Sequence, residues 1–209
     1  MKPLDQLIDK QDDAIVQIQA WQKDAQLAVT ILPAAANSGA QLQQLQITTH
    51  SVLGALVYHT GGVLIADGWL RFLGSGNEQL PRDVVSWNSD NNGYLLVADD
   101  LVGGFFAING GALGSDVGAL YYLSPDSTDW EPLEVAFGDF FEWSMSNNLL
   151  QFYADLGIDS LLNEYRHSSC EQALHFYPPL WSQEGNISSS DRRLVPVTEL
   201  RALKLPNGN

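Results

Sequence analysis

Two neighbouring carboxylates, Asp99 and Asp100, are the first residues whose types could support catalysis. A pair of acids can serve as the acid and the nucleophile of a glycosidase when both groups face the same substrate. Adjacent residues of a strand, however, point to opposite faces of a sheet. We therefore expect Asp99 and Asp100 to form the end of a strand and its turn, and we assign them no catalytic role.

The single cysteine, Cys170, and His167 three residues before it could form a nucleophile and its base. In cysteine enzymes the base normally comes from a distant part of the sequence, so a structural thiol is the better interpretation. Neither the H-E-x-x-H pattern nor another short metal-binding spacing occurs among the histidines, which are His50, His59, His167 and His175. The sequence therefore predicts no catalytic residue and no metal site.

Six glycines between Gly103 and Gly118 could in principle cradle a phosphate. A phosphate-binding loop ends in Gly-Lys-Ser or Gly-Lys-Thr, and this region contains no lysine. The dinucleotide pattern G-x-G-x-x-G also fails, because Gln79 stands where the third glycine would follow Gly74 and Gly76. We expect the glycines to form tight turns, and we predict no cofactor.

The charge of the chain is concentrated in one segment. The 209 residues carry a formal net charge of -15, from 25 acidic and 10 basic side chains. Residues 83–165 contain 14 carboxylates and no lysine or arginine, whereas the other residues carry 11 acids against 10 bases. A field of one sign keeps a protein soluble and also speeds its encounter with a partner of opposite charge. Solubility alone and a docking face for a basic protein are the two interpretations.

Trp130 lies among acids in the sequence SPDSTDWEPL. An aromatic ring surrounded by carboxylates could anchor a basic partner, or it could fold back as a lid on the sheet. Asp126 and Asp129 also have the character of loop acids that bond to their own backbone. The predicted partner-binding residues are Asp99, Asp100, Asp126, Asp129, Trp130 and Glu131.

Several classes of partner are excluded by composition. A pI near 4.3 argues against nucleic acid, because phosphate binding needs a basic surface. Residues 25–66 carry no Asp, Glu, Lys or Arg, but their most apolar piece has only 15 residues and includes His59, Thr60, Gly61 and Gly62, so no membrane span is expected. The first 13 residues have no apolar stretch, so we expect no signal peptide and a cytoplasmic location.

The sequence predicts a single α+β domain over residues 1–209, with a central, mainly antiparallel sheet and helices before and after it. Residues 1–50 should form helices, residues 51–136 the sheet with a short helix near 81–88, and residues 137–209 a C-terminal helix and an irregular extension. Strands are expected at 53–58, 63–66, 69–73, 94–98, 105–108, 119–123 and 133–136. The segment 137–153 should be one helix, and 154–193 should be irregular except for a strand at 174–177.

Four segments carry a resemblance over nearly the whole chain: QITTHSVLGALVYHTGGVLIADGWLRFLGSG, LPRDVVSWN, YLLVADDLVGGFFAINGGALG, and GALYYLSPDSTDWEPL with its FGDFFEW continuation. Together they resemble an uncharacterised bacterial family catalogued as a domain of unknown function, which implies no activity. More remotely, Leu80-Pro81, Gly104, Gly118 and Tyr121-Tyr122 lie where the chain is similar to the SUKH superfamily. That resemblance implies an α+β domain of the immunity type, which binds and blocks a toxin, with residues 154–209 as an addition.

The leading prediction is a non-enzymatic protein-interaction domain with an acidic face, of the immunity type, that binds a basic, toxin-like protein. The alternative is a small-molecule-binding protein or enzyme with a pocket at the rim of the sheet. A homo-oligomer that uses the uncharged residues 25–66 as its contact is a third interpretation.

Overall fold

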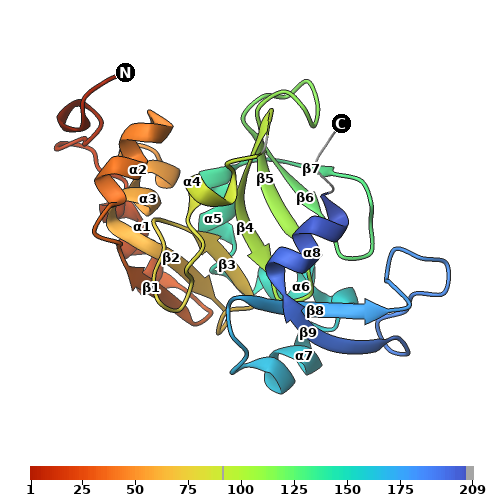
Figure 1. Cartoon of the computed structure of the whole chain (residues 1–209). Coiled ribbons are helices and arrows are strands. Elements are labelled where there is room, and N and C mark those ends of the chain that lie inside the picture. The colour runs from red at the N-terminus through yellow and green to blue at the C-terminus, as the bar shows by residue number, and fades with distance from the viewer. Residues whose placement is uncertain (91, 206–209) are drawn as a thin grey trace.

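A seven-stranded antiparallel sheet forms the centre of the protein in the computed structural model, which describes residues 1–90 and 92–205 (Figure 1). The strands follow one another in space as they do in the chain, so each pairs with its sequence neighbours. They are β1 (Val29–Pro33), β2 (Thr60–Ile65), β3 (Leu70–Leu73), β4 (Tyr94–Asp100), β5 (Phe105–Asn109), β6 (Ala119–Leu123) and β7 (Glu131–Ala136). The α+β prediction is confirmed.

Helices lie before, within and after the sheet, and a second, two-stranded sheet belongs to the C-terminal part. In Figure 1, α5 is seen behind the main sheet, whereas α8 lies in front of β4–β6. The helices are η1 (Leu4–Gln6), α1 (Ile15–Asp24), α2 (Ser38–Leu45), α3 (Val52–His59), α4 (Val84–Trp87), α5 (Phe137–Trp143), α6 (Asn148–Phe152), η2 (Ala154–Leu156), α7 (Ile158–Tyr165) and α8 (Val197–Lys204). The small sheet pairs β8 (Gln172–Tyr177) with β9 (Asp191–Pro196).

The strand predicted at 53–58 is wrong, because these residues form helix α3. Ser51 caps the helix by accepting a hydrogen bond from the Gly54 backbone N–H at 3.1 Å. Gly54 is needed here, since a Cβ at this position would lie 2.0 Å from the Thr48 carbonyl oxygen. A short apolar run fits a buried helix as well as a buried strand, so periodicity could not separate them.

The single helix predicted at 137–153 is interrupted between α5 and α6. The Ser144 and Ser146 hydroxyls donate to the carbonyl oxygens of Phe141 and Trp143, at 2.7 and 2.8 Å. Such side-chain bonds compete with the helical pattern. The break folds α6 back, so that Phe152 and Trp143 contact each other edge to face at 5.9 Å between ring centres.

The segment 154–193 is more regular than predicted, since it contains η2, α7, β8 and the start of β9. Strand β9 was missed because its sequence, DRRLVP, begins with three charged residues that are exposed in the structure. The predicted strand at 174–177 is part of β8, and helix α8 follows β9 directly.

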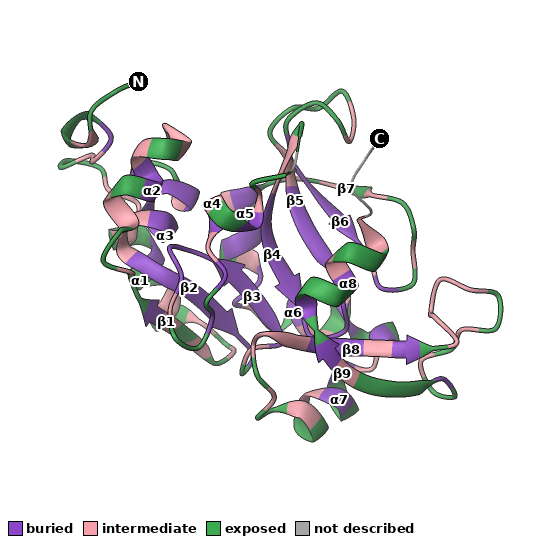
Figure 2. Cartoon of the chain, in the orientation of Figure 1, coloured by how far each residue is buried: buried purple, intermediate pink, exposed green. Residues whose placement is uncertain are grey.

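The two faces of the main sheet have different partners. Phe72 on β3 contacts Phe141 of α5, with ring centres 4.8 Å apart, so this face carries an aromatic core. Its neighbour Arg71 points to the other face, where it meets the C-terminal extension at Cys170. Figure 2 shows that β2 and β3 are buried along their whole lengths. Adjacent side chains of one strand therefore lie in different environments, one apolar and one polar.

Both outer strands have features that discourage further strand pairing. In β1, the Gln22 amide donates to the Val29 carbonyl oxygen at 3.2 Å, and Pro33 ends the strand. In β7, Pro132 lacks an N–H, and Glu134 has a left-handed backbone with φ of 56° in a register irregularity. Proline, charge and bulges are the devices that natural sheets use to protect their edges.

Candidate functional site

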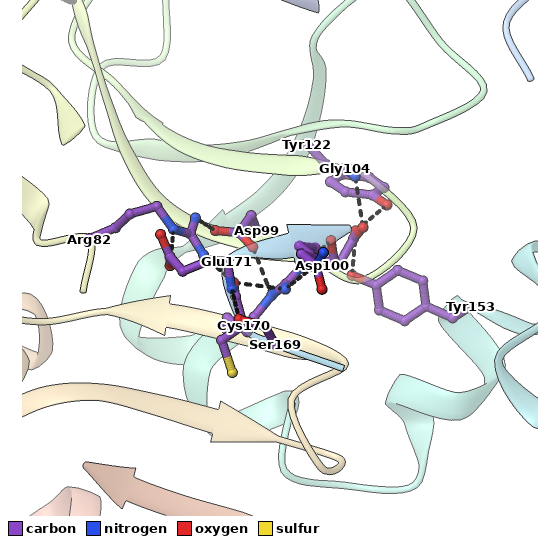
Figure 3. Close-up of polar contacts among 11 residues, drawn as sticks. Arg82, Asp99, Asp100, Gly104, Tyr122, Tyr153, Ser169, Cys170 and Glu171 are labelled. Carbon is purple, nitrogen blue, oxygen red and sulfur yellow. Dashed lines mark hydrogen bonds and ion pairs between the residues drawn. The ribbon is translucent and has the colours of Figure 1, made fainter. Parts of the chain in front are cut away.

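A buried ion-pair network surrounds Asp99 on the face of the sheet that contacts the C-terminal extension (Figure 3). Asp99 Oδ1 lies 2.8 Å from Arg71 Nε, and the other Asp99 oxygen contacts the Arg82 guanidinium. Arg82 Nε in turn donates to Glu171 Oε1 at 2.8 Å. The side chains of Asp99, Arg71 and Arg82 are at most 5% exposed. Opposite charges therefore compensate one another where water is excluded.

Local structure places each member of this network. Asp99 and Arg71 are direct partners across the β3–β4 pair. Arg82 lies just before helix α4, whose start is fixed by Asp83 through bonds from the N–H groups of Val85 and Ser86 at 2.9 Å. Because the cap determines where the helix begins, it also fixes the position of Arg82.

Both arginines also bind the backbone of the C-terminal extension. The Cys170 carbonyl oxygen accepts from Arg71 Nη1 at 3.0 Å and from Arg82 Nη2 at 2.7 Å. Burial lowers the pKa of Arg82, but the charges of Asp99 and Glu171 outweigh it and raise that pKa above its ordinary value. Arg82 therefore stays charged, and the network holds the extension against the sheet.

Asp100 forms a separate buried network on the opposite face (Figure 3). Its Oδ2 accepts hydrogen bonds from the Tyr122 and Tyr153 hydroxyls at 2.7 and 3.0 Å, and its Oδ1 accepts from the Gly104 N–H at 2.7 Å. Burial raises the pKa of Asp100 despite these donors. Burial and the nearby carboxyl also raise the pKa values of Tyr122 and Tyr153 well above 10.

Neither network has the geometry of an active site. The Asp99 and Asp100 side chains are engaged by several partners and closed to solvent, so a substrate has no access to them. Burial raises the pKa of Cys170, which disfavours the reactive thiolate. Within residues 1–90 and 92–205, no group of three His, Cys, Asp or Glu side chains could hold a metal ion. The networks contribute to structure.

The predicted partner-binding residues divide into two groups. Asp99 and Asp100 are 1% and 0% exposed, which corrects the expectation that they lie on a contact surface, although they do form the end of strand β4 as predicted. Their burial follows from the arginine and tyrosine partners described above. In contrast, Asp126, Asp129 and Glu131 are exposed. A partner could reach these three carboxylates directly.

Trp130 is partly exposed. Its surroundings combine features of both interpretations made from the sequence, a lid on the sheet and an anchor for a partner. Its ring contacts Tyr94 of β4 at 5.6 Å between ring centres, as a lid on the sheet would. The remaining surface of the ring is open to solvent beside Asp129 and Glu131. Packing fixes the ring, and its free surface remains accessible.

Eleven of the fourteen carboxylates in residues 83–165 are exposed: Asp90, Asp116, Asp126, Asp129, Glu131, Glu134, Asp139, Glu142, Asp155, Asp159 and Glu164. Among the residues that the structure describes, arginine ion pairs reach two of these eleven, Asp90 and Glu164. Six of the others fall between Asp126 and Glu142, in the loop before β7, in β7 and in α5. We call these six, Asp126, Asp129, Glu131, Glu134, Asp139 and Glu142, the acidic face.

An apolar groove of about 280 Å³ opens beside β7. Its lining comes from β7, α5 and α6, and comprises Leu133, Val135, Asp139, Phe140, Trp143 and Phe152. One member of the acidic face, Asp139, lines the groove, and Glu134 and Glu142 are sequence neighbours of other lining residues. The groove therefore combines a hydrophobic lining with one exposed carboxylate.

Sequence reasoning missed the groove and both buried networks. The density of aromatic residues in 137–153 indicated apolar surface, but the break that turns Phe152 toward Trp143 had no clear signal. Arg71 and Arg82 could have been suspected, because they are the nearest cations before an uninterrupted acidic segment and can pair with a buried carboxylate. The groove residues instead required the three-dimensional arrangement.

Comparisons with known proteins agree with the first resemblance drawn from the sequence. The family model described as "Protein of unknown function DUF2625" matches residues 4–200. YbfG, an uncharacterized protein of Escherichia coli (strain K12), is 40% identical over 205 residues, which cover 96% of this chain and 94% of YbfG. An uncharacterized protein of Haemophilus influenzae is 33% identical over 206 residues, with coverage of 94% and 90%. None of these matches supports the more remote SUKH resemblance.

Proposed function

We propose that this chain, which belongs to the DUF2625 family of proteins of unknown function, is a non-enzymatic interaction domain whose acidic face binds a basic protein. The observation that carries the proposal is the presence of six exposed, like-charged carboxylates between residues 126 and 142, one of which, Asp139, lines an apolar groove. Like charges repel one another and cost stability, so a cationic partner would relieve that repulsion. The groove would add apolar contact at the centre of the interface.

The chemistry of the exposed residues supports binding more than catalysis. The groove is lined by five apolar side chains and one carboxylate, Asp139. An active site generally brings several polar groups together in one pocket. Small-molecule binding in this groove is the second candidate function, and it is favoured by the position of the groove at the rim of the sheet beside β7.

An immunity-type function, in which the basic partner is a toxin, is the specific form that the SUKH resemblance implies. The acidic face fits this form through charge alone, because toxin domains that act on nucleic acid need a basic surface. Candidate partners are therefore basic proteins encoded beside the gene for this chain. The same electrostatic argument applies to any basic partner, so charge is the property to test first.

The experiment is co-expression of the full chain with basic candidate proteins from its own organism, followed by calorimetric titration of each purified pair. Charge reversal by Glu131→Lys with Glu134→Lys should weaken binding at least about tenfold, and added salt should weaken the unmodified pair. A matched control is Asp5→Lys with Glu184→Lys, two exposed acids outside residues 83–165. Equal effects of the two double variants, or binding that is insensitive to salt, would contradict the proposal.

A further inference from the structure

We propose that the groove beside β7 is a receptor for one arginine side chain of the partner. This inference rests on the proposed function, because it names the group that the acidic face would recognise. Three aromatic rings and one carboxylate provide its chemistry: Phe140, Trp143, Phe152 and Asp139. Aromatic faces and carboxylates both attract a cation.

The rings form walls that can enclose a side chain on more than one side. Trp143 stands nearly perpendicular to Phe152, with an interplanar angle of 83° and 5.9 Å between ring centres. Phe140 stacks against Trp143 at 27° and 5.6 Å, and it is only 4% exposed. Phe140 therefore supports Trp143 from the core, while Trp143 and Phe152 keep exposed surface. Their perpendicular arrangement resembles a corner of the aromatic cages that bind cations.

The groove is large enough to take a long side chain. Its volume of about 280 Å³ lies just below the range of pockets that take drug-sized ligands, which begins near 300 Å³. Leu133 and Val135 complete the lining with apolar surface. This surface can contact the methylene groups of a long cationic side chain, while its charged end meets Asp139.

The apolar lining selects arginine over lysine. A guanidinium is more weakly hydrated than an ammonium, stacks on aromatic rings and can pair with a carboxylate through two parallel hydrogen bonds. Asp139 is exposed, and residues 83–165 contain no lysine or arginine that could compete for it from the same segment. An ammonium would give up more hydration to enter a groove with one carboxylate.

Strand addition is disfavoured as a way of binding at this place. Pro132 and the left-handed Glu134 disrupt the outer edge of β7, so an extended peptide would find an irregular row of donors and acceptors. Side-chain insertion does not need that row. The edge and the groove thus favour recognition by one inserted group.

The test uses N-acetyl-arginine-methylamide as a probe and the indole N–H signal of Trp143 in nuclear magnetic resonance spectra of the full chain. The signal is assigned from its loss in Trp143→Phe. We expect a saturable shift with the arginine probe, weaker binding of the matching lysine probe, and no shift with the uncharged citrulline probe. Asp139→Asn should weaken arginine binding about fivefold.

Asp159→Asn is the matched control, because both aspartates are exposed and lie in the first turn of a helix. A loss of charge or of helix stability alone would affect both variants equally. Equal affinities of the two variants, equal binding of the arginine and lysine probes, or no movement of the Trp143 signal would overturn the inference.

A second variant separates this inference from the proposed function. Val135→Arg places a cation within the groove and should block the arginine probe, whereas Ser160→Arg, on the exposed surface of α7, should not. If a basic protein binds Val135→Arg and the unmodified chain equally well, the groove inference fails and the acidic face stands. If the arginine probe binds in the groove but basic proteins do not bind, the proposed function fails instead.

Discussion

The carboxylates of Asp99 and Asp100, neighbours at the end of β4, serve buried networks on opposite faces of the sheet. Asp99 is compensated by cationic side chains, whereas Asp100 is surrounded by hydroxyl and amide donors. The first network joins the sheet to the C-terminal extension, and the second joins it to the segment after α6 through Tyr153. The end of β4 therefore holds chain segments against both faces of the sheet.

Replacing Asp99 should destabilise the protein strongly. Asp99→Asn removes the negative charge between Arg71 and Arg82, whose side chains are 1% and 5% exposed. Breaking a buried pair by removing one partner typically costs about 3–5 kcal/mol, because a buried charge remains without compensation. Urea unfolding of the purified variant measures this free energy.

The control for Asp99 is Asp90→Asn, which removes a carboxylate that pairs with Arg201 at 2.6 Å near the surface. Since the Asp90 side chain is 41% exposed, the loss should stay below about 1 kcal/mol. Similar losses in the two variants would show that burial does not distinguish these ion pairs.

Asp100 should make stability fall as pH rises above the ordinary carboxyl range. Its pKa in the folded protein is raised above 3.8, mainly by burial, so the folded state keeps this proton to a higher pH than the unfolded chain. The stabilisation is complete below 3.8 and is lost as pH rises through the folded pKa. The asparagine of Asp100→Asn stays neutral. The free energy of unfolding of this variant should therefore increase relative to that of the unmodified protein as pH rises from 3.8 to the folded pKa of Asp100.

Asp116 provides a control with the opposite sign. The Tyr121 hydroxyl, which donates to its carboxylate, lowers the pKa of Asp116. The stabilisation that Asp116 provides is therefore present above the ordinary carboxyl pKa, and it is lost as pH falls through the lowered pKa of the folded protein. Urea unfolding at a series of acidic to neutral pH values should give opposite trends for Asp100→Asn and Asp116→Asn. Parallel trends would contradict the assignment of Asp100.

The fold was predictable where local patterns agree with tertiary pairing. Strands β4, β5 and β6 have strong strand composition, and Asn109-Gly110 is a strong turn signal between two of them. Helix α3 was not predictable in the same way, because VLGALVYH is apolar at nearly every position and has no period. Strand β9 depends on its pairing with β8, a contact that its own charged sequence does not indicate.

The candidate site was predictable only in part. Because strand side chains alternate between the two faces of a sheet, the sequence correctly predicted that Asp99 and Asp100 point in opposite directions. Their burial depends on Arg71, Arg82 and two tyrosines that are distant in the sequence. The acidity of 83–165 was visible at once. Its coincidence with the groove arises from the fold, since β7, α5 and α6 must pack together before the groove exists.

Cys170 should react slowly with thiol reagents while the protein is folded. Burial raises the pKa of the thiol, and its side chain is only partly accessible, so the reactive thiolate is scarce and shielded. The reaction with an aromatic disulfide, followed by absorbance, should be several-fold slower in buffer than in urea. Because the chain has a single cysteine, the signal needs no correction. A folded-state rate equal to the unfolded rate would contradict a structural thiol.

Lys204 should make the protein more stable as the solution becomes alkaline. Its ammonium donates to the Ser124 carbonyl oxygen and lies 5.4 Å from the centre of the Trp181 ring. Burial lowers the pKa of Lys204 from 10.5 to about 8. Between these values the unfolded chain binds more protons than the folded protein, so the free energy of unfolding rises with pH.

Lys204→Met removes this titration while keeping a long side chain. Relative to the variant, the unmodified protein should gain up to about 1.4 kcal/mol per pH unit above pH 8, measured by urea unfolding. Titration of the buried tyrosines occurs in both proteins and cancels in the difference. Lys10→Met, at an exposed lysine, is the matched control. If the difference between the unmodified protein and Lys204→Met is constant with pH, the amine is not buried as the structure shows, and α8 must pack differently at its last turn.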